Sequence, residues 1–144
     1  MSNQIVFLCP HGAAKSVLAA AYCRRLADQW SIPLHATSAG TEPDAEVAPP
    51  VVTLLHAEGI DVADQRPHRV TSEELATADR IISLGCDLGD LARPGMAIER
   101  WDDVPSPSQN LLAARDCIRA HVEQLVQAMR HGDAHTPDTA QEVF

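Results

Sequence analysis

The sequence predicts an α/β fold of three layers, in which an open, parallel, four-stranded sheet carries helices on both faces. Short apolar runs alternate along the chain with longer segments of helical periodicity, which is the order of elements in a parallel sheet. The chain has 144 residues, which suits one domain with a single core. We expect that domain to span residues 1–130, and the polar, non-periodic residues 131–144 to form a flexible tail.

The first half of the chain predicts two buried strands and two helices. Residues 4–8 and 33–38 are short runs bounded by polar residues or glycine, and both are predicted to be strands. Between them, residues 16–30 have an apolar side chain at every fourth position, as one face of a helix requires. A second helix is expected over residues 49–59, because prolines fit its first turn and a glycine ends it.

The second half predicts a short helix, two more strands and a long last helix. The short helix covers residues 71–78, where a threonine and a glutamate three positions apart have the spacing of a capping box. Residues 79–84 and 96–101 are the expected third and fourth strands. The last helix is expected to begin at residues 106–109, where a serine cap, a proline and a return glutamine follow one another, and its buried stripe ends at Met129.

The segment that joins the first strand to the first helix has the form of an anion-binding loop. Cys9 ends the strand, and Lys15 and Ser16 open the helix. Backbone N–H groups of such a loop, and the first N–H groups of the helix, have no intrahelical partner and attract negative charge. The same field favours a thiolate, so Cys9 is a candidate nucleophile, with a packing role as the alternative. The expected oxyanion ligands are Pro10, His11, Gly12, Ala13, Ala14 and Lys15.

The composition excludes several classes of partner. A net charge of −9 argues against nucleic acids and acidic membranes. No membrane span is visible, and residues 5–8 are too short and lack the basic lead-in of a signal peptide. Four cysteines without an export signal indicate reduced thiols in the cytoplasm. Because no Cys-x2-Cys pair occurs, we expect no metal site, and we expect no cofactor.

The Cys-x5-Lys-Ser loop resembles the Cys-x5-Arg-Ser loop of the low-molecular-weight protein tyrosine phosphatases and the related arsenate reductases. The resemblance extends over residues 4–129. It implies the fold described above and the hydrolysis of a phosphomonoester through a cysteinyl-phosphate on Cys9. The segments that carry it beyond the loop are 37–41, 59–61 with 66–68, 78–84, and 101–105 with the helix that contains Arg115.

The resemblance also implies roles for a serine and for an acid. Ser16 would donate its hydroxyl to the thiolate and help it leave. The family acid is an aspartate immediately before a proline on the loop after the fourth strand, and it protonates the leaving oxygen. Here the corresponding segment is Asp-Asp-Val-Pro at residues 102–105, so the pair is interrupted. Asp103 is the first choice for this acid and Asp102 the second, with two solvated loop acids as the alternative.

Lys15 stands where the family has an arginine that holds two oxygens with a planar fork. Lysine keeps the charge but cannot make that bidentate contact. The substitution therefore preserves attraction for an oxyanion while weakening stabilisation of the transition state, which depends on fixed donors. A solvated helix residue beside a vestigial site is the alternative.

Two further functions remain open at this point. An arsenate reductase would need an external small thiol, because Cys86 fits only the first of two relay cysteines and Arg93 stands near the place of the second. A catalytically impaired oxyanion-binding module is favoured by Lys15, by Gly12 and by the interrupted Asp–Pro pair. The expected partners are thus a phosphate-like oxyanion or phosphorylated substrate and, for the reductase, a small-thiol reductant.

Overall fold

The computed structural model describes residues 3–92 and 95–130, and the tail expected at residues 131–144 lies outside the described residues. Strands and helices alternate along most of the chain, as the sequence predicts. In chain order the elements are β1 (Asn3–Leu8), α1 (Lys15–Gln29), β2 (Leu34–Ala39), α2 (Pro49–Ala57), α3 (Ser72–Thr77), β3 (Arg80–Ser83), the 3-10 turn η1 (Gly89–Leu91), β4 (Ile98–Arg100) and α4 (Leu111–Arg130).

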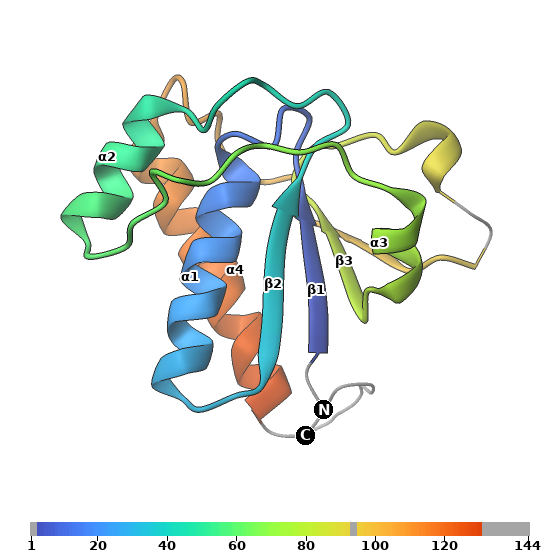
Figure 1. The fold of residues 1–144 in the computed structure, drawn as a ribbon. Coiled ribbons are helices and arrows are strands. Elements are labelled where there is room, and N and C mark those ends of the chain that lie inside the picture. The colour runs from blue at the N-terminus through green and yellow to red at the C-terminus, as the bar shows by residue number, and fades with distance from the viewer. Residues whose placement is uncertain (1–2, 93–94, 131–144) are drawn as a thin grey trace.

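The four strands form one parallel sheet in the order β2-β1-β3-β4, with β1 between β2 and β3. Leu8 at the end of β1 is level with Ala39 of β2 and Ser83 of β3. The carboxyl ends of the strands therefore meet at one edge of the sheet, the upper edge in Figure 1. Ligands of open parallel sheets bind beyond this edge, which places the loop after β1 at the expected position for a site.

Alternate residues of β1 pack on opposite faces of the sheet. Ile5 and Phe7 belong to the larger core cluster, with buried residues of α1, α2 and α4, whereas Val6 and Leu8 pack with Leu75 of α3. Figure 1 shows α1, α2 and α4 on one side of the sheet and α3 on the other. The three-layer α/β class predicted from the sequence is confirmed.

Helix α4 is the longest helix among the described residues, and its buried stripe packs against α1. Within the ranges 3–92 and 95–130, no helix has the length and apolarity that a crossing of the membrane requires. The stripe consists of Ala114, Ile118, Val122, Leu125, Val126 and Met129.

Two helix signals in the sequence operate as predicted. The Thr71 hydroxyl accepts the Glu74 N–H at 3.1 Å, and the Glu74 carboxylate accepts the Thr71 N–H at 3.0 Å, which completes the capping box of α3. Gly59 follows the end of α2 with a φ of +83°, the left-handed conformation that glycine adopts at little cost.

The start of α4 differs from the prediction. The helix begins at Leu111, and the Asn110 side chain accepts the Ala113 N–H at 3.0 Å in the manner of a cap. Residues 106–109 instead form a turn in which the Gln109 N–H bonds to the Ser106 carbonyl at 3.1 Å. Proline suits the second position of a turn as well as the first turn of a helix, so the motif alone did not decide between them.

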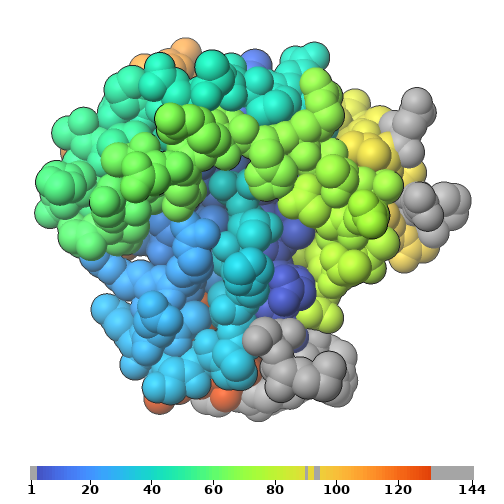
Figure 2. Space-filling model, viewed as in Figure 1, coloured from blue at the N-terminus to red at the C-terminus, as the bar shows by residue number. Residues whose placement is uncertain are grey.

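The connection from α2 to α3 is tied to the end of β2. Gly40 donates its N–H to the His68 carbonyl at 3.0 Å and accepts the Val70 N–H at 2.9 Å. The connection crosses the molecule at the carboxyl end of the sheet, where Figure 2 shows it as a green band between α2 and α3. The residues that follow β2 are thereby held beside the loop that follows β1.

Candidate active site

Cys9 and Ser16 face each other across the loop between β1 and α1. The Cys9 Sγ lies 3.1 Å from the Ser16 Oγ and accepts the Ser16 N–H at 3.4 Å. Both residues are buried, with 4% and 0% of their surfaces exposed. A thiolate has no proton to give, so once Cys9 ionises the Ser16 hydroxyl becomes a donor to it. The start of α1 thus offers two hydrogen-bond donors to a thiolate at this position.

The carbonyl oxygens of the loop are bonded to the segment 42–48, which follows β2. Three backbone N–H groups of this segment donate to three backbone carbonyl groups of the loop. These bonds fix the direction in which the peptide groups of the loop face. They run from Glu42 to Pro10 (2.8 Å), from Asp44 to His11 (3.0 Å) and from Ala48 to Ala13 (2.9 Å).

The N–H groups of the loop are left for a ligand. Those of His11, Ala13, Ala14 and Lys15 make no hydrogen bond to any part of the chain that the structure describes. Helix α1 also begins without a side-chain cap, so its first donors stay open. Gly12 has a φ of +59°, which lets the backbone curl and point successive N–H groups to one place. The arrangement is an anion-binding nest at a helix N-terminus.

A pocket of about 480 Å³ opens beside the loop, and Cys9 and Lys15 line it. Its walls come from the loop, from the start of α2 and from the turn before α4. The lining is mostly apolar with a few polar groups, as in many small-molecule sites. The lining residues are Cys9, Pro10, His11, Ala13, Ala14, Lys15, Asp44, Ala48, Pro50, Val51, Ser106, Pro107, Ser108 and Leu111.

Lys15, the only lysine in the chain, is half-buried at the start of α1. Its ammonium nitrogen lies beside Gly85, in the turn after β3, where an added Cβ would be 3.6 Å from the Nζ. The charge is thus held at the carboxyl edge of the sheet, next to the nest. The absence of a side chain at Gly85 leaves space around this ammonium group.

The two aspartates that the sequence indicates as acids do not line the pocket. Asp102 pairs with Arg100 at 3.2 Å. The Asp103 carboxylate lies 2.8 Å from the His121 Nε2, and this hydrogen bond lowers the pKa of the Asp103 carboxyl. A carboxyl with a lowered pKa is a poor proton donor at neutral pH. The wall on which an acid was expected carries Ser106 and Ser108, whose hydroxyls are 2.9 Å apart.

The carboxylate that does line the pocket is Asp44, which sequence reasoning missed. Its Oδ1 lies 3.5 Å from the His11 Nδ1, and both side chains are more than half exposed at the pocket mouth. Asp44 is far from the loop in sequence and sits in a polar, turn-like segment without a motif. The backbone bonds between its segment and the loop, among them the bond from Asp44 to His11, bring the carboxylate to the nest.

The other three cysteines are held as neutral thiols. Burial raises the pKa of the Cys23 thiol to about 12 and also raises the pKa of Cys86 and Cys117. Cys86 follows β3 and donates its S–H to the Thr41 hydroxyl at 3.7 Å. Because a thiol attacks only as the thiolate, these three cysteines are poor nucleophiles at neutral pH.

Known proteins resemble this chain over most of its length. The sequence model of the family described as low molecular weight phosphotyrosine protein phosphatase matches residues 4–132. The arsenate reductase of Bacillus subtilis is 30% identical over 115 residues, which cover 76% of this chain and 79% of the relative.

Solved structures share the fold. A protein tyrosine phosphatase from Entamoeba histolytica superposes with a TM-score of 0.80 at 17% identity, covering 92% of this chain and 99% of that one. The thioredoxin-dependent arsenate reductase of Corynebacterium glutamicum gives a TM-score of 0.77 at 22% identity over 91% of this chain. The chain spans 63% of the length of that reductase.

The close approach of Gly40 to the loop leads to a test of the nest. A Cβ on Gly40 would lie 2.7 Å from the Gly12 nitrogen and 2.8 Å from the Pro10 oxygen, which are backbone atoms. We expect Gly40→Ala to displace the loop and to weaken the binding of inorganic phosphate by at least about tenfold, or ~1.4 kcal/mol, in isothermal titration calorimetry.

Gly89→Ala is the matched control, because a Cβ at Gly89 meets no atom within 4 Å. Gly89 has a φ of +55°, which Gly40 does not share, so the control carries backbone strain of its own without any contact with the loop. Equal affinity of the Gly40→Ala and Gly89→Ala variants for phosphate would contradict the role assigned to Gly40.

Proposed function

Because this chain belongs to the low-molecular-weight phosphotyrosine protein phosphatase family, we propose that it hydrolyses a phosphomonoester through a cysteinyl-phosphate on Cys9. The observation that carries the proposal is the set of open loop N–H groups around a sulfur that itself receives the Ser16 N–H. This geometry suits a tetrahedral oxyanion whose central atom lies above the sulfur.

The loop and Lys15 bind the phosphoryl group. The open N–H groups of the nest donate to its non-bridging oxygens, and the Lys15 ammonium adds a positive charge. The net charge of the chain is −9, so attraction for the anionic substrate is local to this loop. The pocket beside the loop holds the part of the substrate to which the phosphate is attached.

The reaction has two steps. The Cys9 thiolate attacks phosphorus in line with the ester oxygen, the S–P bond forms, and the P–O bond to the leaving group breaks. The leaving oxygen takes a proton from an acid. In the second step a water molecule attacks the cysteinyl-phosphate, gives its proton to the same group, and releases inorganic phosphate. The Ser16 hydroxyl then stabilises the returning thiolate.

We propose Asp44 as this acid, with His11 beside it. Asp44 lines the pocket and its backbone is bonded to the loop, so its carboxyl is available to a leaving group above Cys9. Asp102 and Asp103, the acids favoured by the sequence, are paired with Arg100 and His121 outside the pocket lining. Their participation would require the loop after β4 to move.

A second candidate is an arsenate reductase, favoured by the 30% identity to the Bacillus subtilis enzyme of that name. The Cys9 thiolate would displace water from arsenate to form an S–As bond. A small thiol would then attack the Cys9 sulfur, so that arsenic leaves as arsenite with the electron pair. The mixed disulfide that remains is reduced by a second thiol, and two thiols are oxidised for each As(V) reduced to As(III).

Both reactions need Cys9 in its reduced form. All four cysteines of the chain are free. We therefore propose a cytoplasmic location, where cellular thiols keep cysteines reduced.

Assays on p-nitrophenyl phosphate, and on arsenate with a small thiol such as glutathione or mycothiol, test the proposal. We expect phosphate release that Cys9→Ser lowers by more than about a thousandfold, as for other lost nucleophiles. Phosphate binding should survive in Cys9→Ser, because the nest does not depend on the nucleophile. Cys23→Ala is the matched control, since Cys23 is buried in α1 and is not a pocket-lining residue.

Each other outcome of these assays has a defined meaning. Full activity of Cys9→Ser would exclude the covalent mechanism. Arsenate-dependent thiol oxidation without phosphate release would favour the reductase. Phosphate binding without turnover in either assay would identify an impaired oxyanion-binding module.

Replacement of Lys15 tests how much catalytic rate is lost because a lysine stands where the family has an arginine. We expect Lys15→Arg to raise kcat on p-nitrophenyl phosphate by about a hundredfold, because a planar fork supplies two fixed donors to the transition state. Gly85, which lies beside the Lys15 Nζ, has no side chain to obstruct the larger head group. Lys15→Met is the paired variant and should weaken phosphate binding. If Lys15→Arg leaves kcat unchanged, another part of the loop limits the rate.

The identity of the acid is tested with leaving groups of different basicity. We expect Asp44→Asn to lower kcat on an alkyl phosphate by about a hundredfold or more, because an alkoxide needs a proton to leave. The effect on p-nitrophenyl phosphate should be smaller, because nitrophenolate is a good leaving group. Asp103→Asn is the control and should change neither rate. A selective loss in Asp103→Asn, with Asp44→Asn unaffected, would return the role to Asp103.

A further inference from the structure

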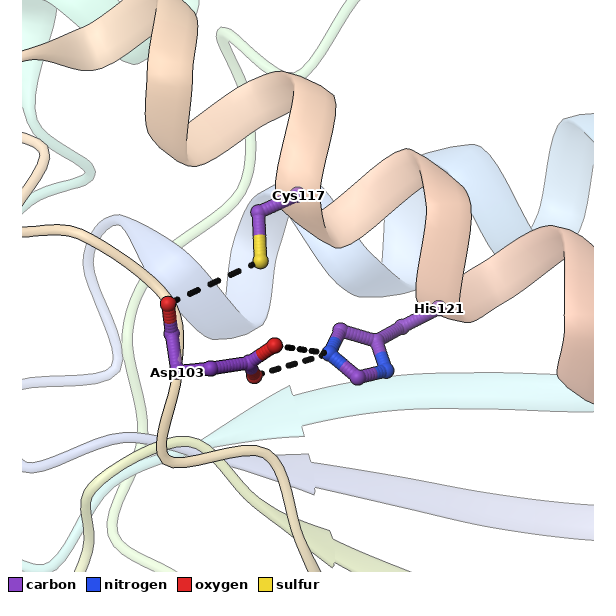
Figure 3. A group of neighbouring side chains, drawn as sticks. All are labelled: Asp103, Cys117 and His121. Atoms are coloured by element: carbon purple, nitrogen blue, oxygen red, sulfur yellow. Dashed lines mark hydrogen bonds and ion pairs between the residues drawn. The ribbon is translucent and has the colours of Figure 1, made fainter.

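We propose that Asp103, Cys117 and His121 form a zinc site that fastens the loop after β4 to helix α4. Figure 3 shows the three side chains directed toward one another, with Asp103 on the loop and the other two on α4. One ligand atom from each residue lies within 4.8 Å of the others. The site is separate from the pocket, because none of the three lines it.

The ligand types and their spacing suit zinc. Thiolate, imidazole and carboxylate are the three side-chain ligands that zinc accepts. Three protein ligands leave the fourth tetrahedral position to a water molecule, so this site is more open than the four-ligand sites that are usual for structural zinc. Cys117 and His121 are four residues apart, which places them on one face of α4. The thiolate makes the set too soft for magnesium or calcium, which take oxygen ligands. The sequence showed no Cys-x2-Cys pair, and here the ligands come from two elements.

The distances are close to those of a tetrahedral site. Zinc bonds to nitrogen and oxygen of about 2.0 Å, and to sulfur of about 2.3 Å, require ligand atoms about 3.3–3.5 Å apart. The His121 Nε2 lies 2.8 Å and 3.1 Å from the two Asp103 carboxylate oxygens. The Cys117 Sγ lies within 4.8 Å of the ligand atoms of the other two residues. Its 3.8 Å contact is with the backbone carbonyl of Asp103, which is not a ligand of the site. A shift of about 1 Å at exposed Asp103 would admit the ion, which takes the place of the shared proton.

His121 is already oriented for this role. Its ring stacks on Trp101, with ring centroids 4.6 Å apart and planes 13° from parallel. Trp101 is itself fixed, because it is buried against Phe7 and donates its indole N–H to the Glu99 carboxylate at 2.8 Å. A ligand held in place by its neighbours loses little conformational entropy when the metal binds.

The charge around the cluster favours a cation. The arginines of α4 on either side of Cys117 are turned to other partners. Arg115 pairs with Glu58 at 3.2 Å and with Asp116 at 2.9 Å, and Arg119 lies over the Tyr22 ring at 5.6 Å. Without metal Cys117 is a neutral thiol, and zinc binding would release its proton. The resulting thiolate and Asp103 would then supply two negative charges for the divalent ion.

The site would act on the shape of the pocket. The loop after β4, which contains Asp103, continues to Ser106 and Ser108 on the pocket wall before α4 begins. Zinc bound to Asp103 and to the second and third turns of α4 would hold the start of this loop against the helix. The metal is therefore a structural clip, and no step of the proposed reaction passes through it.

Cobalt(II) provides a direct test, because it takes zinc sites and reports a thiolate ligand by a near-ultraviolet charge-transfer band. We expect the full-length protein to bind one equivalent of cobalt with this band, and zinc to displace it. Cys117→Ser should abolish the band. His121→Ala should weaken binding by at least about tenfold, since even partners outside the coordination sphere contribute this much.

Two controls separate the clip from adventitious binding. Cys9→Ser should keep the band, because Cys9 lies at the other site. His68→Ala removes a histidine that contacts Glu74 at 2.8 Å in the same kind of exposed pair, and it should bind cobalt as the wild type does. Zinc should raise the Tm of the wild type but not of Cys117→Ser. A wild type without a stoichiometric charge-transfer band, or a band that survives Cys117→Ser, would overturn the proposal.

Discussion

The bonds between the segment 42–48 and the loop after β1 are the constraint on which the site depends. A peptide group presents its N–H and its C=O in opposite directions, so a carbonyl oxygen that is bonded outward turns the neighbouring amides inward. The segment supplies three N–H donors to the loop carbonyls. It is held beside the loop by the attachment of Gly40 to the connection between α2 and α3. The geometry of the anion nest is thus fixed by two neighbouring segments that contribute no nucleophile of their own.

The nest has one cationic side chain beside it, in a chain that is acidic overall. Lys15 is the sole lysine, and it stands at the N-terminus of α1 beside open backbone donors. The buried sulfur of Cys9 receives its hydrogen bond from the same helix end. Donors fixed by backbone geometry do not have to reorganise as charge develops, which is the main source of electrostatic catalysis. A flexible lysine in place of an arginine leaves this backbone contribution intact and reduces the side-chain contribution.

The loop after β4 connects two sites of different chemistry. At its start Asp103 lies against His121 and Cys117 on α4, and farther along Ser106 lines the pocket. An acid that is engaged at the helix cannot serve the pocket in the same conformation. Asp44 lines the same pocket from the segment after β2. We therefore assign proton transfer to that segment and attachment to α4 to the loop after β4.

The sequence by itself determined the fold class, the strand–loop–helix placement of Cys9 and Ser16, and the capping box of α3, because each depends on residues close together in the chain. Hydrophobic periodicity and helix capping are local effects, so a linear pattern carries them. Only the tertiary structure decided that Asp44 faces the pocket, that Asp103 turns to His121, and that a turn rather than a helix follows Ser106. The two aspartate outcomes depend on contacts between segments distant in sequence, where several carboxylates compete and packing selects one. The turn after Ser106 is a local choice between two neighbouring caps, Ser106 and Asn110, that the linear pattern does not rank.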